Sequence, residues 1–390
     1  MNSLESKLPQ YGASIFSVMS GLAVEHRAIN LSQGFPEFNP PIALQQAVFE
    51  AISAGRNQYA PMPGLLELRE LLAQRIKEWR GVEVNPETEI TLVPGATAGL
   101  YATFSALVHP GDEVIVLDPS YDSYAPVIEL NGGVVRRVNI HMGIDYVDGN
   151  TSPWPWNEVK EAISSNTKWI VVNTPHNPLG CTMKQQDWDD LASILVDTNV
   201  GVISDEVYEH MVMDQQSHVS VLQHPQLAQK AVAISSFGKT FHATGWKLGY
   251  VTAPAYISKE IRKVYQFLAF AANTPMQVAA HAFLLNNPNY EASVAQLMQQ
   301  KRDYFLHLIE PAGMKLLPCE GSYFAVADVS EYTQLSDLEY AKWLTIEKGL
   351  ATIPMSAFSK TTLPGKFLRF CFAKEDHTLE KAAQIICSLK

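Results

Sequence analysis

Polar side chains close several apolar runs in the middle of the chain. The run GVISDEVY ends in Asp205 and Tyr208, and KWIVVNT leads into PHNPLG, which contains Asn177. A third run, AVAISSFG, is followed directly by Lys239. Ligands of a doubly wound sheet bind at the carboxyl ends of its strands. We therefore expect these four side chains to meet in one crevice.

An anion site is expected beside this crevice. The run ITLVPG opens directly into a helical stretch at Ala96 and Thr97, and the free amide groups of a helix start attract anions. Ser236 and Lys247 lie near the ends of two other runs and can add contacts, of which the charged one is the stronger. The sequence therefore predicts a cradle for a phosphate group.

Together, these residue types meet the requirements of pyridoxal phosphate as a cofactor. Lys239 can supply the amine that binds the aldehyde, provided that burial and nearby positive charge lower its pKa, because only the neutral form attacks a carbonyl. Asp205 can keep the pyridine nitrogen protonated. Asn177 and Tyr208 can donate to the phenolate oxygen. We expect pyridoxal 5′-phosphate and no metal ion.

The elements that must position these residues alternate between strand and helix. From about residue 88, β-branched runs without strict alternation are separated by helical stretches, which is typical of a parallel sheet covered on both faces. The runs expected to be strands are EITLVPG, EVIVLD, 134–140, 168–174, 201–208, 231–238 and 247–253. The sequence predicts an α/β fold, a three-layer sandwich with a mostly parallel sheet, plus a smaller α+β domain.

The domain boundaries follow from a change of pattern after Pro275. Helical stretches then predominate, with strands expected in KLLPCEGSYFAVADV and in FLRFCFA. A chain of 390 residues is also long for a single core. We expect an N-terminal segment (1–40) that packs with the small domain, a large cofactor-binding domain (41–285) and a small domain (286–390).

Four motifs resemble those of the class I and II aminotransferases, which belong to the fold-type I pyridoxal-phosphate enzymes. They are SSFGKTFHATGWKLGY (235–250), NTPHNPLG, SDEVYE and FLRFCFA. The similarity runs from NLSQGFPEF (30–38) through NQYAPMPG (57–64) to the C-terminus and is closest to the methionine and kynurenine aminotransferase subgroup. It implies transfer of the amino group of an L-amino acid, with methionine, aromatic amino acids or kynurenine favoured, to a 2-oxo acid by a ping-pong mechanism.

The resemblance also implies how the cofactor is held. Lys239 matches the Schiff-base lysine and general acid/base, and Asp205 the partner of the pyridine nitrogen. Tyr121, in DPSYDSY, would stack on the ring. The other cofactor contacts that the resemblance implies are Asn177 and Tyr208 at the phenolate oxygen, and Ala96, Thr97, Ser236 and Lys247 around the phosphate.

For the substrate, the resemblance implies that Arg369 clamps the α-carboxylate, helped by Asn177 and the backbone near Gly34. Arg369 lies inside an apolar strand run, where an unpaired guanidinium is expensive, so a bound anion or a buried carboxylate must compensate its charge. Phe16 and Tyr323 either line the side-chain pocket or simply pack.

Two departures and one further match concern specificity and assembly. Many relatives carry arginine where Lys247 stands, and lysine lacks the bidentate fork. No second arginine is evident for a side-chain carboxylate, which disfavours aspartate as a substrate. Tyr59 resembles the tyrosine that reaches the cofactor phosphate of the neighbouring subunit, which implies a homodimer.

Other functions fit these motifs less well. GKT at 238–240 resembles the end of a P-loop, but position 233 is alanine where the motif needs glycine, and no GxGxxG follows the first strand. The same cofactor also supports other reactions. A C–S β-lyase remains the alternative enzyme, and a pyridoxal-phosphate-binding sensor the alternative without catalysis.

Composition limits the partners. The net charge of -11 argues against general binding to nucleic acid or anionic membranes, which needs a basic face. The N-terminus lacks a signal-peptide pattern, and no run of about 18 apolar residues occurs, so we expect a cytoplasmic protein with small-molecule substrates. The four cysteines are scattered, which favours reduced thiols over zinc or disulfides.

Overall fold

A seven-stranded sheet forms the centre of the computed structural model, which describes residues 5–142, 146 and 152–389. Its order is β2-β8-β7-β6-β5-β3-β4, and β8 is antiparallel to both of its neighbours while the other pairs are parallel. The strands are β2 (Ile90–Val93), β3 (Glu113–Asp118), β4 (Val134–Asn139), β5 (Thr167–Asn173), β6 (Gly201–Asp205), β7 (Ala231–Ser236) and β8 (Gly249–Thr252). The mostly parallel sheet is confirmed.

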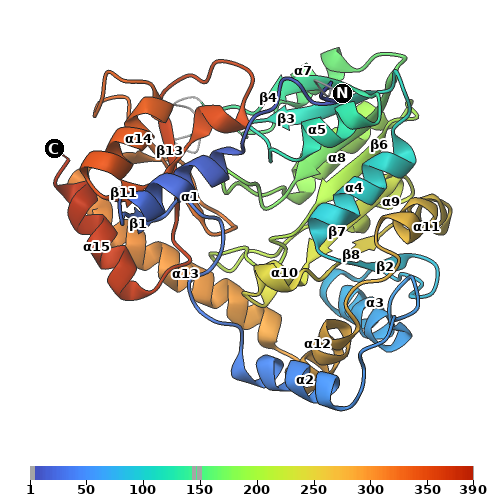
Figure 1. The fold of residues 1–390 in the computed structure, drawn as a ribbon. Coiled ribbons are helices and arrows are strands. Elements are labelled where there is room, and N and C mark those ends of the chain that lie inside the picture. The colour runs from blue at the N-terminus through green and yellow to red at the C-terminus, as the bar shows by residue number, and fades with distance from the viewer. Residues whose placement is uncertain (1–4, 143–145, 147–151, 390) are drawn as a thin grey trace.

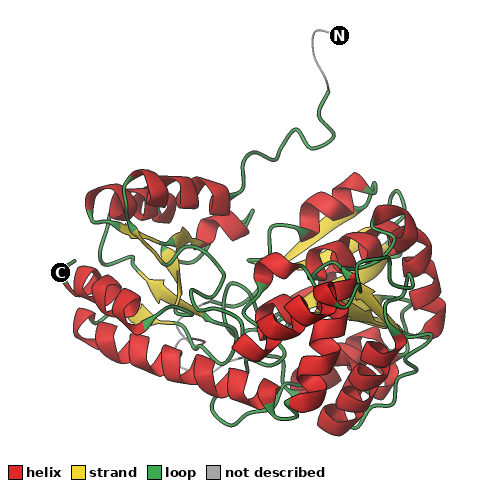
Figure 2. Cartoon of the chain, turned by 60° about the horizontal axis from the view of Figure 1, so that its bottom comes forward, coloured by secondary structure: helices red, strands yellow, loops and turns green. Residues whose placement is uncertain are grey.

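Helices cover both faces of this sheet (Figure 2). Alternate residues of a strand enter different cores: Val114 and Val116 of β3 pack in one cluster, and Ile115 and Leu117 in another. This is why the apolar runs lack strict alternation. The first core is covered by α4 (Ala96–Leu107), α5 (Tyr124–Leu130) and α11 (Ala255–Leu268), and the second by α7 (Trp156–Ala162) and α8 (Gln185–Leu195).

The C-terminal part of the chain forms a four-stranded antiparallel sheet in the order β12-β13-β10-β9. Helices α13 and α15 lie together beside it, and α14 contacts β12 and β13 (Figure 1). These elements are β9 (Lys315–Leu316), β10 (Phe324–Asp328), β12 (Ile353–Pro354), β13 (Phe367–Cys371), α13 (Tyr290–Ile309), α14 (Asp337–Glu347) and α15 (Asp376–Cys387). The expected α+β pattern is present.

The N-terminal segment joins this C-terminal unit. Helix α1 (Ile15–Glu25) packs on α14, and strand β1 (Ile29–Asn30) pairs in parallel with β11 (Leu350–Ala351). A strand of two residues carries no periodicity, so the sequence pattern does not reveal β1. The boundaries at 40 and 285 stay a prediction.

A third group of helices lies against the β2 side of the large sheet (Figure 1). Helix α12 packs on α2 and α3, and the three share a core with β2 and β8. Their bounds are α2 (Ile42–Ser53), α3 (Leu66–Arg80) and α12 (Thr274–Asn286). Within the described ranges, no helix combines the length and apolar character needed to cross a membrane.

Candidate active site

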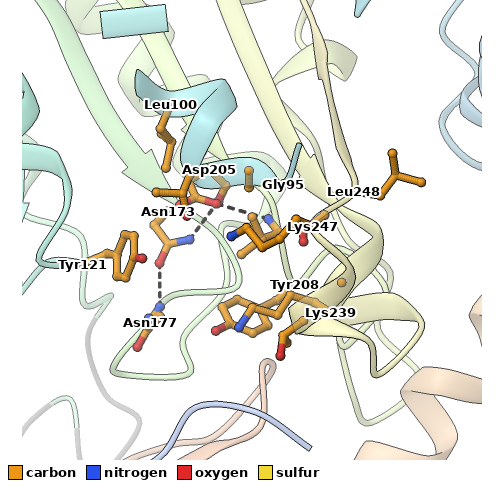
Figure 3. A pocket seen from close by; sticks show the side chains of 16 residues that line it. Gly95, Leu100, Tyr121, Asn173, Asn177, Asp205, Tyr208, Lys239, Lys247 and Leu248 are labelled. Atoms are coloured by element: carbon orange, nitrogen blue, oxygen red, sulfur yellow. Dashed lines mark hydrogen bonds between the residues drawn. The ribbon is translucent and has the colours of Figure 1, made fainter. Parts of the chain in front are cut away.

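A cavity opens where β5, β6 and β7 end and α4 begins (Figure 3). The three strands are parallel neighbours, so their final residues, Asn173, Asp205 and Ser236, lie at the same edge of the sheet. The cavity brings together the predicted residues Ala96, Thr97, Tyr121, Asn177, Asp205, Tyr208, Ser236, Lys239 and Lys247. The rule that ligands bind at strand ends therefore located the cavity correctly.

Lys239 lies one turn beyond β7, in the four-residue helix α10 (Phe237–Thr240). The side chain is half-buried, and its Nζ donates to the hydroxyl of Tyr323 at 2.8 Å and to the carbonyl of Gly34 at 3.2 Å. No carboxylate of the described chain forms an ion pair with it. Burial lowers the pKa of Lys239 to about 8, so the neutral amine is accessible at mildly alkaline pH.

Asp205 is buried, and donors from three elements hold it. Its Oδ2 accepts from the hydroxyl of Tyr124 at 2.6 Å, and its Oδ1 from the amide of Val207 at 3.3 Å. Its carbonyl accepts from Nδ2 of Asn173 at 2.8 Å. Burial raises the pKa of Asp205 to about 6, although the hydrogen bond from Tyr124 acts in the opposite direction. A cation opposite this carboxyl would favour its ionised form.

Sequence reasoning missed two residues of this arrangement. Asn173 accepts the amide of Asn177 on its Oδ1 at 2.6 Å and so fixes the loop that carries Asn177 (Figure 3). Asn173 closes an apolar run, so the strand-end rule could have found it. Tyr124 lies three residues after Tyr121, at the first position of α5, but no local pattern links it to Asp205.

The start of α4 forms a positively polarised cradle. Gly95 caps the helix with a φ of 81°, a conformation that side chains rarely adopt. A Cβ at Gly95 would lie 3.1 Å from Cε and 3.2 Å from Nζ of Lys247, so the ammonium lies directly over the helix N-terminus. Lys247 itself has a φ of 55°, strained backbone of the kind that collects at binding sites. Helix dipole and ammonium act together on any anion there.

Arg369 on β13 is fully buried, with 0% of its surface exposed. Its Nη1 donates to Oδ1 of Asn177 at 2.7 Å and its Nη2 to the carbonyl of Ser32 at 3.1 Å. Its Nε has no partner, and the guanidinium carbon lies 3.9 Å from the ring centroid of Phe324. Burial lowers the pKa of Arg369 to about 10, which leaves it charged at neutral pH.

No ion pair compensates this charge within the described ranges. Other arginines do form ion pairs, for example Arg302 with Asp214, but none of these pairs includes Arg369. The charge of Asp122 acts on Arg369, but the two form no ion pair. A buried cation without such a pair is unfavourable unless an anion joins it. Of the two compensations expected from the sequence, the structure therefore favours a bound anion.

A second, more open cavity adjoins the first and shares Tyr121, Asn177, Tyr208 and Lys239 with it. Its remaining wall comes from helix α1, from strands β10 and β13, and from the segment that follows β1. These residues are Phe16, Ser17, Ser20, Gln33, Gly34, Phe35, Phe324 and Arg369. Phe16 thus lines this cavity, whereas Tyr323 lines neither of the two cavities.

Tyr59, expected to contact the cofactor phosphate, also lies apart from both cavities. It is 82% exposed, and its ring meets Phe270 edge-on at 5.3 Å. Tyr59 therefore makes no contribution to the cavity of its own chain as described.

Comparisons with known proteins identify the family of the chain. The profile of the family "Aminotransferase class I and II" matches residues 26–386. The chain is 47% identical to methionine aminotransferase of Escherichia coli K12 over 380 residues, 97% of each chain. It is 34% identical to kynurenine–oxoglutarate transaminase of Dictyostelium discoideum, covering 97% of this chain and 95% of the relative.

The fold comparison extends over the whole chain. A crystal structure of the Escherichia coli methionine aminotransferase superposes with a TM-score of 0.95 at 46% identity and covers 99% of both chains. Sequence, fold and the strand-end cavity agree: this chain belongs to the class I and II aminotransferases, a family of pyridoxal-phosphate-dependent enzymes.

Proposed function

We propose that this aminotransferase binds pyridoxal 5′-phosphate in the strand-end cavity and transfers the amino group of a neutral L-amino acid to a 2-oxo acid. Methionine, aromatic amino acids and kynurenine are the preferred donors in this proposal. One observation carries it: the Lys239 amine, without a carboxylate partner in the described chain, lines the same cavity as the Asp205 carboxylate and the N-terminus of α4.

The donor set of the cavity fits this cofactor group by group. Lys239 suits the aldehyde, Asp205 the ring nitrogen, and Tyr208 with Asn177 the phenolate oxygen. The absence of a side chain at Gly95 leaves the helix amides open to a phosphate beneath Lys247. These assignments pair opposite charges: the Asp205 carboxylate meets the protonated ring nitrogen, and the Lys247 ammonium meets the phosphate.

When bound, pyridoxal phosphate supplies an electron sink that allows the bond between the α-carbon and its hydrogen to break. The neutral Nζ of Lys239 takes the α-proton and later returns it, which is general acid–base catalysis. Tyr124 and the Val207 amide orient Asp205 towards the ring nitrogen. Arg369 binds the α-carboxylate of amino acid and 2-oxo acid in turn, so that both use one site, as ping-pong kinetics require.

The second cavity supports a neutral substrate side chain. Phe16, Phe35 and Phe324 supply apolar surface. Ser20 and Gln33 are uncharged and hydrogen-bond to each other at 2.7 Å. Among the described residues that line this cavity, Lys239 and Arg369 carry the positive charges, and both are assigned to other tasks. A side-chain carboxylate would find no cation of its own there.

A panel of amino donors tests the substrate class. We expect kcat/KM for methionine, phenylalanine and kynurenine to exceed that for aspartate by roughly 10- to 100-fold, since an unpaired buried polar group costs ~1–3 kcal/mol. Formation of each 2-oxo acid is measured with several acceptors. A panel in which aspartate wins would overturn the preference. Release of thiol and pyruvate from an S-substituted cysteine, without amino transfer, would favour the β-lyase.

We further propose that the active unit is a homodimer in which Tyr59 contacts the cofactor phosphate of the other subunit. Tyr59, Phe267 and Phe270 are 82%, 87% and 49% exposed, and two of the rings touch. Exposed apolar side chains that gather in a patch mark interaction sites. A phenol hydroxyl with no role in its own cavity is free to act across such an interface.

Hybrid dimers test this role of Tyr59. Tyr59→Phe is expected to weaken pyridoxal-phosphate binding about 10- to 100-fold, because a hydrogen bond to a charged group contributes ~1.5–3 kcal/mol. Mixing it with Lys239→Ala forms a hybrid in which one cavity has both Lys239 and Tyr59, provided that Tyr59 acts in trans. Cofactor affinity of that cavity, measured by absorbance titration, should then return to the wild-type value. If it stays weak, Tyr59 does not act across the interface.

A further inference from the structure

Tyr323, just before β10, forms a triangle of hydrogen bonds with Lys239 and Gly34, and its hydroxyl also interacts with that of Tyr208. Its hydroxyl donates to the carbonyl of Gly34 at 2.6 Å and accepts from Nζ of Lys239 at 2.8 Å. The same Nζ donates to the Gly34 carbonyl at 3.2 Å. The three residues come from distant parts of the chain, so the triangle depends on the tertiary fold.

The hydrogen-bond pattern defines how the amine is oriented. The proton of the Tyr323 hydroxyl is committed to Gly34, so this hydroxyl offers a lone pair to Lys239. A neutral amine has two N–H groups and one lone pair. The two oxygens occupy both N–H groups and leave the lone pair directed away from Tyr323, which lines neither cavity.

The phenol is held firmly in this position. Tyr323 is 0% exposed, and its ring packs edge-on against Tyr208 at 5.2 Å and Phe324 at 4.8 Å. Burial raises the pKa of Tyr323 well above its ordinary value, so the hydroxyl keeps its proton. Packing and charge state therefore fix Tyr323 as a neutral acceptor beside the amine.

We propose that Tyr323 is a positioning residue that, with the Gly34 carbonyl, holds the free ε-amine of Lys239 with its lone pair open to the α-proton of the substrate. It acts through Lys239 and touches neither substrate nor cofactor. The inference rests on the proposed role of Lys239 as acid and base. It adds that the orientation of the amine is set by Tyr323, a group outside both cavities.

Tyr323→Phe removes one acceptor and keeps the ring. We expect kcat to fall about 10- to 100-fold, less than the roughly 10²- to 10⁴-fold that the whole acid–base group contributes, with KM changed less than about threefold. The deuterium isotope effect with α-deuterated methionine should rise, because proton transfer becomes slower. The acid limb of the pH profile should move to lower pH, because the lost acceptor stabilised the ammonium more than the amine.

Two measurements on the full chain stripped of cofactor report on the amine without turnover. The apparent pKa for arylation of Lys239 by fluorodinitrobenzene, located by peptide mapping, should be lower in Tyr323→Phe. The affinity for added pyridoxal phosphate should stay within about threefold. A 3-fluorotyrosine at position 323 keeps a weaker acceptor, so it should retain most of the rate and shift the pH limb less.

Tyr332→Phe is the matched control, because the Tyr332 hydroxyl also donates to a backbone carbonyl, that of Ala312, at 2.6 Å. Its kinetics and pH limb should equal those of the wild type. A Tyr323→Phe enzyme with kcat within twofold and an unmoved limb overturns the inference. A loss of activity with lower thermal stability, but without a change in the pH limb or the isotope effect, also overturns it. A wild type inactive with every donor would instead refute the proposed function.

Discussion

Lys239→Arg is expected to lose amino transfer by at least about 10²- to 10⁴-fold, the contribution of a general acid–base group alone. Arginine preserves the positive charge of the cavity, but its guanidinium stays protonated and can neither attack an aldehyde nor take a proton. Wild-type Lys239 is suited to both tasks, because burial lowers its pKa to about 8.

Borohydride reduction supplies the measurement that separates a covalent role from a structural one. After pyridoxal phosphate is added, the wild-type chain should turn yellow, and reduction should fix the pyridoxyl group to the peptide that contains Lys239. Lys230→Arg is the control, because Lys230 donates to the carbonyls of Leu195 and Thr198 at 2.9 and 3.0 Å. This variant should still be labelled at Lys239 as the wild type is. A colourless wild type, or a label on another lysine, would exclude Lys239 as the cofactor lysine.

The central sheet could be predicted because each of its strands corresponds to an apolar run in the sequence. Its boundaries were less predictable. The run 201–208 was expected to be one strand, but β6 ends at Asp205, and the buried Val207 and Tyr208 continue into the site. Apolar character marks burial, whether in a sheet or in a cavity wall. The antiparallel direction of β8 also has no local signal.

The candidate site was predictable in its chemical types and less so in its hydrogen-bond partners. Lys239, Asp205 and Asn177 each follow an apolar run, so the strand-end rule selected them. The contacts that orient them come from remote parts of the chain: Tyr124 reaches Asp205 across 81 positions, and Gly34 reaches Lys239 across 205. Such pairings depend on tertiary packing, which no periodicity encodes.

Arg369→Ala is expected to lower kcat/KM for every amino donor by roughly 30- to several-thousand-fold. Removing one partner of a desolvated charge pair costs ~2–5 kcal/mol, and each ~1.4 kcal/mol is a factor of about ten. The loss should appear mainly in KM, and equally for amino acids and 2-oxo acids, because the α-carboxylate is common to both. Steady-state kinetics with methionine, phenylalanine and two acceptors measure it.

The control for a purely structural effect is Arg302→Ala, because Arg302 is also mostly buried but contacts both carboxylate oxygens of Asp214 at 2.6 Å. That variant should lower thermal stability and leave KM unchanged. Arg369→Lys should lie between alanine and wild type, since lysine keeps the charge but loses the bidentate fork. Because Arg369 is buried without an ion-pair partner in the described chain, its loss should destabilise the fold less than the loss of Arg302. Unchanged kinetics in Arg369→Ala would mean that the guanidinium only packs against Phe324 and does not bind a substrate carboxylate.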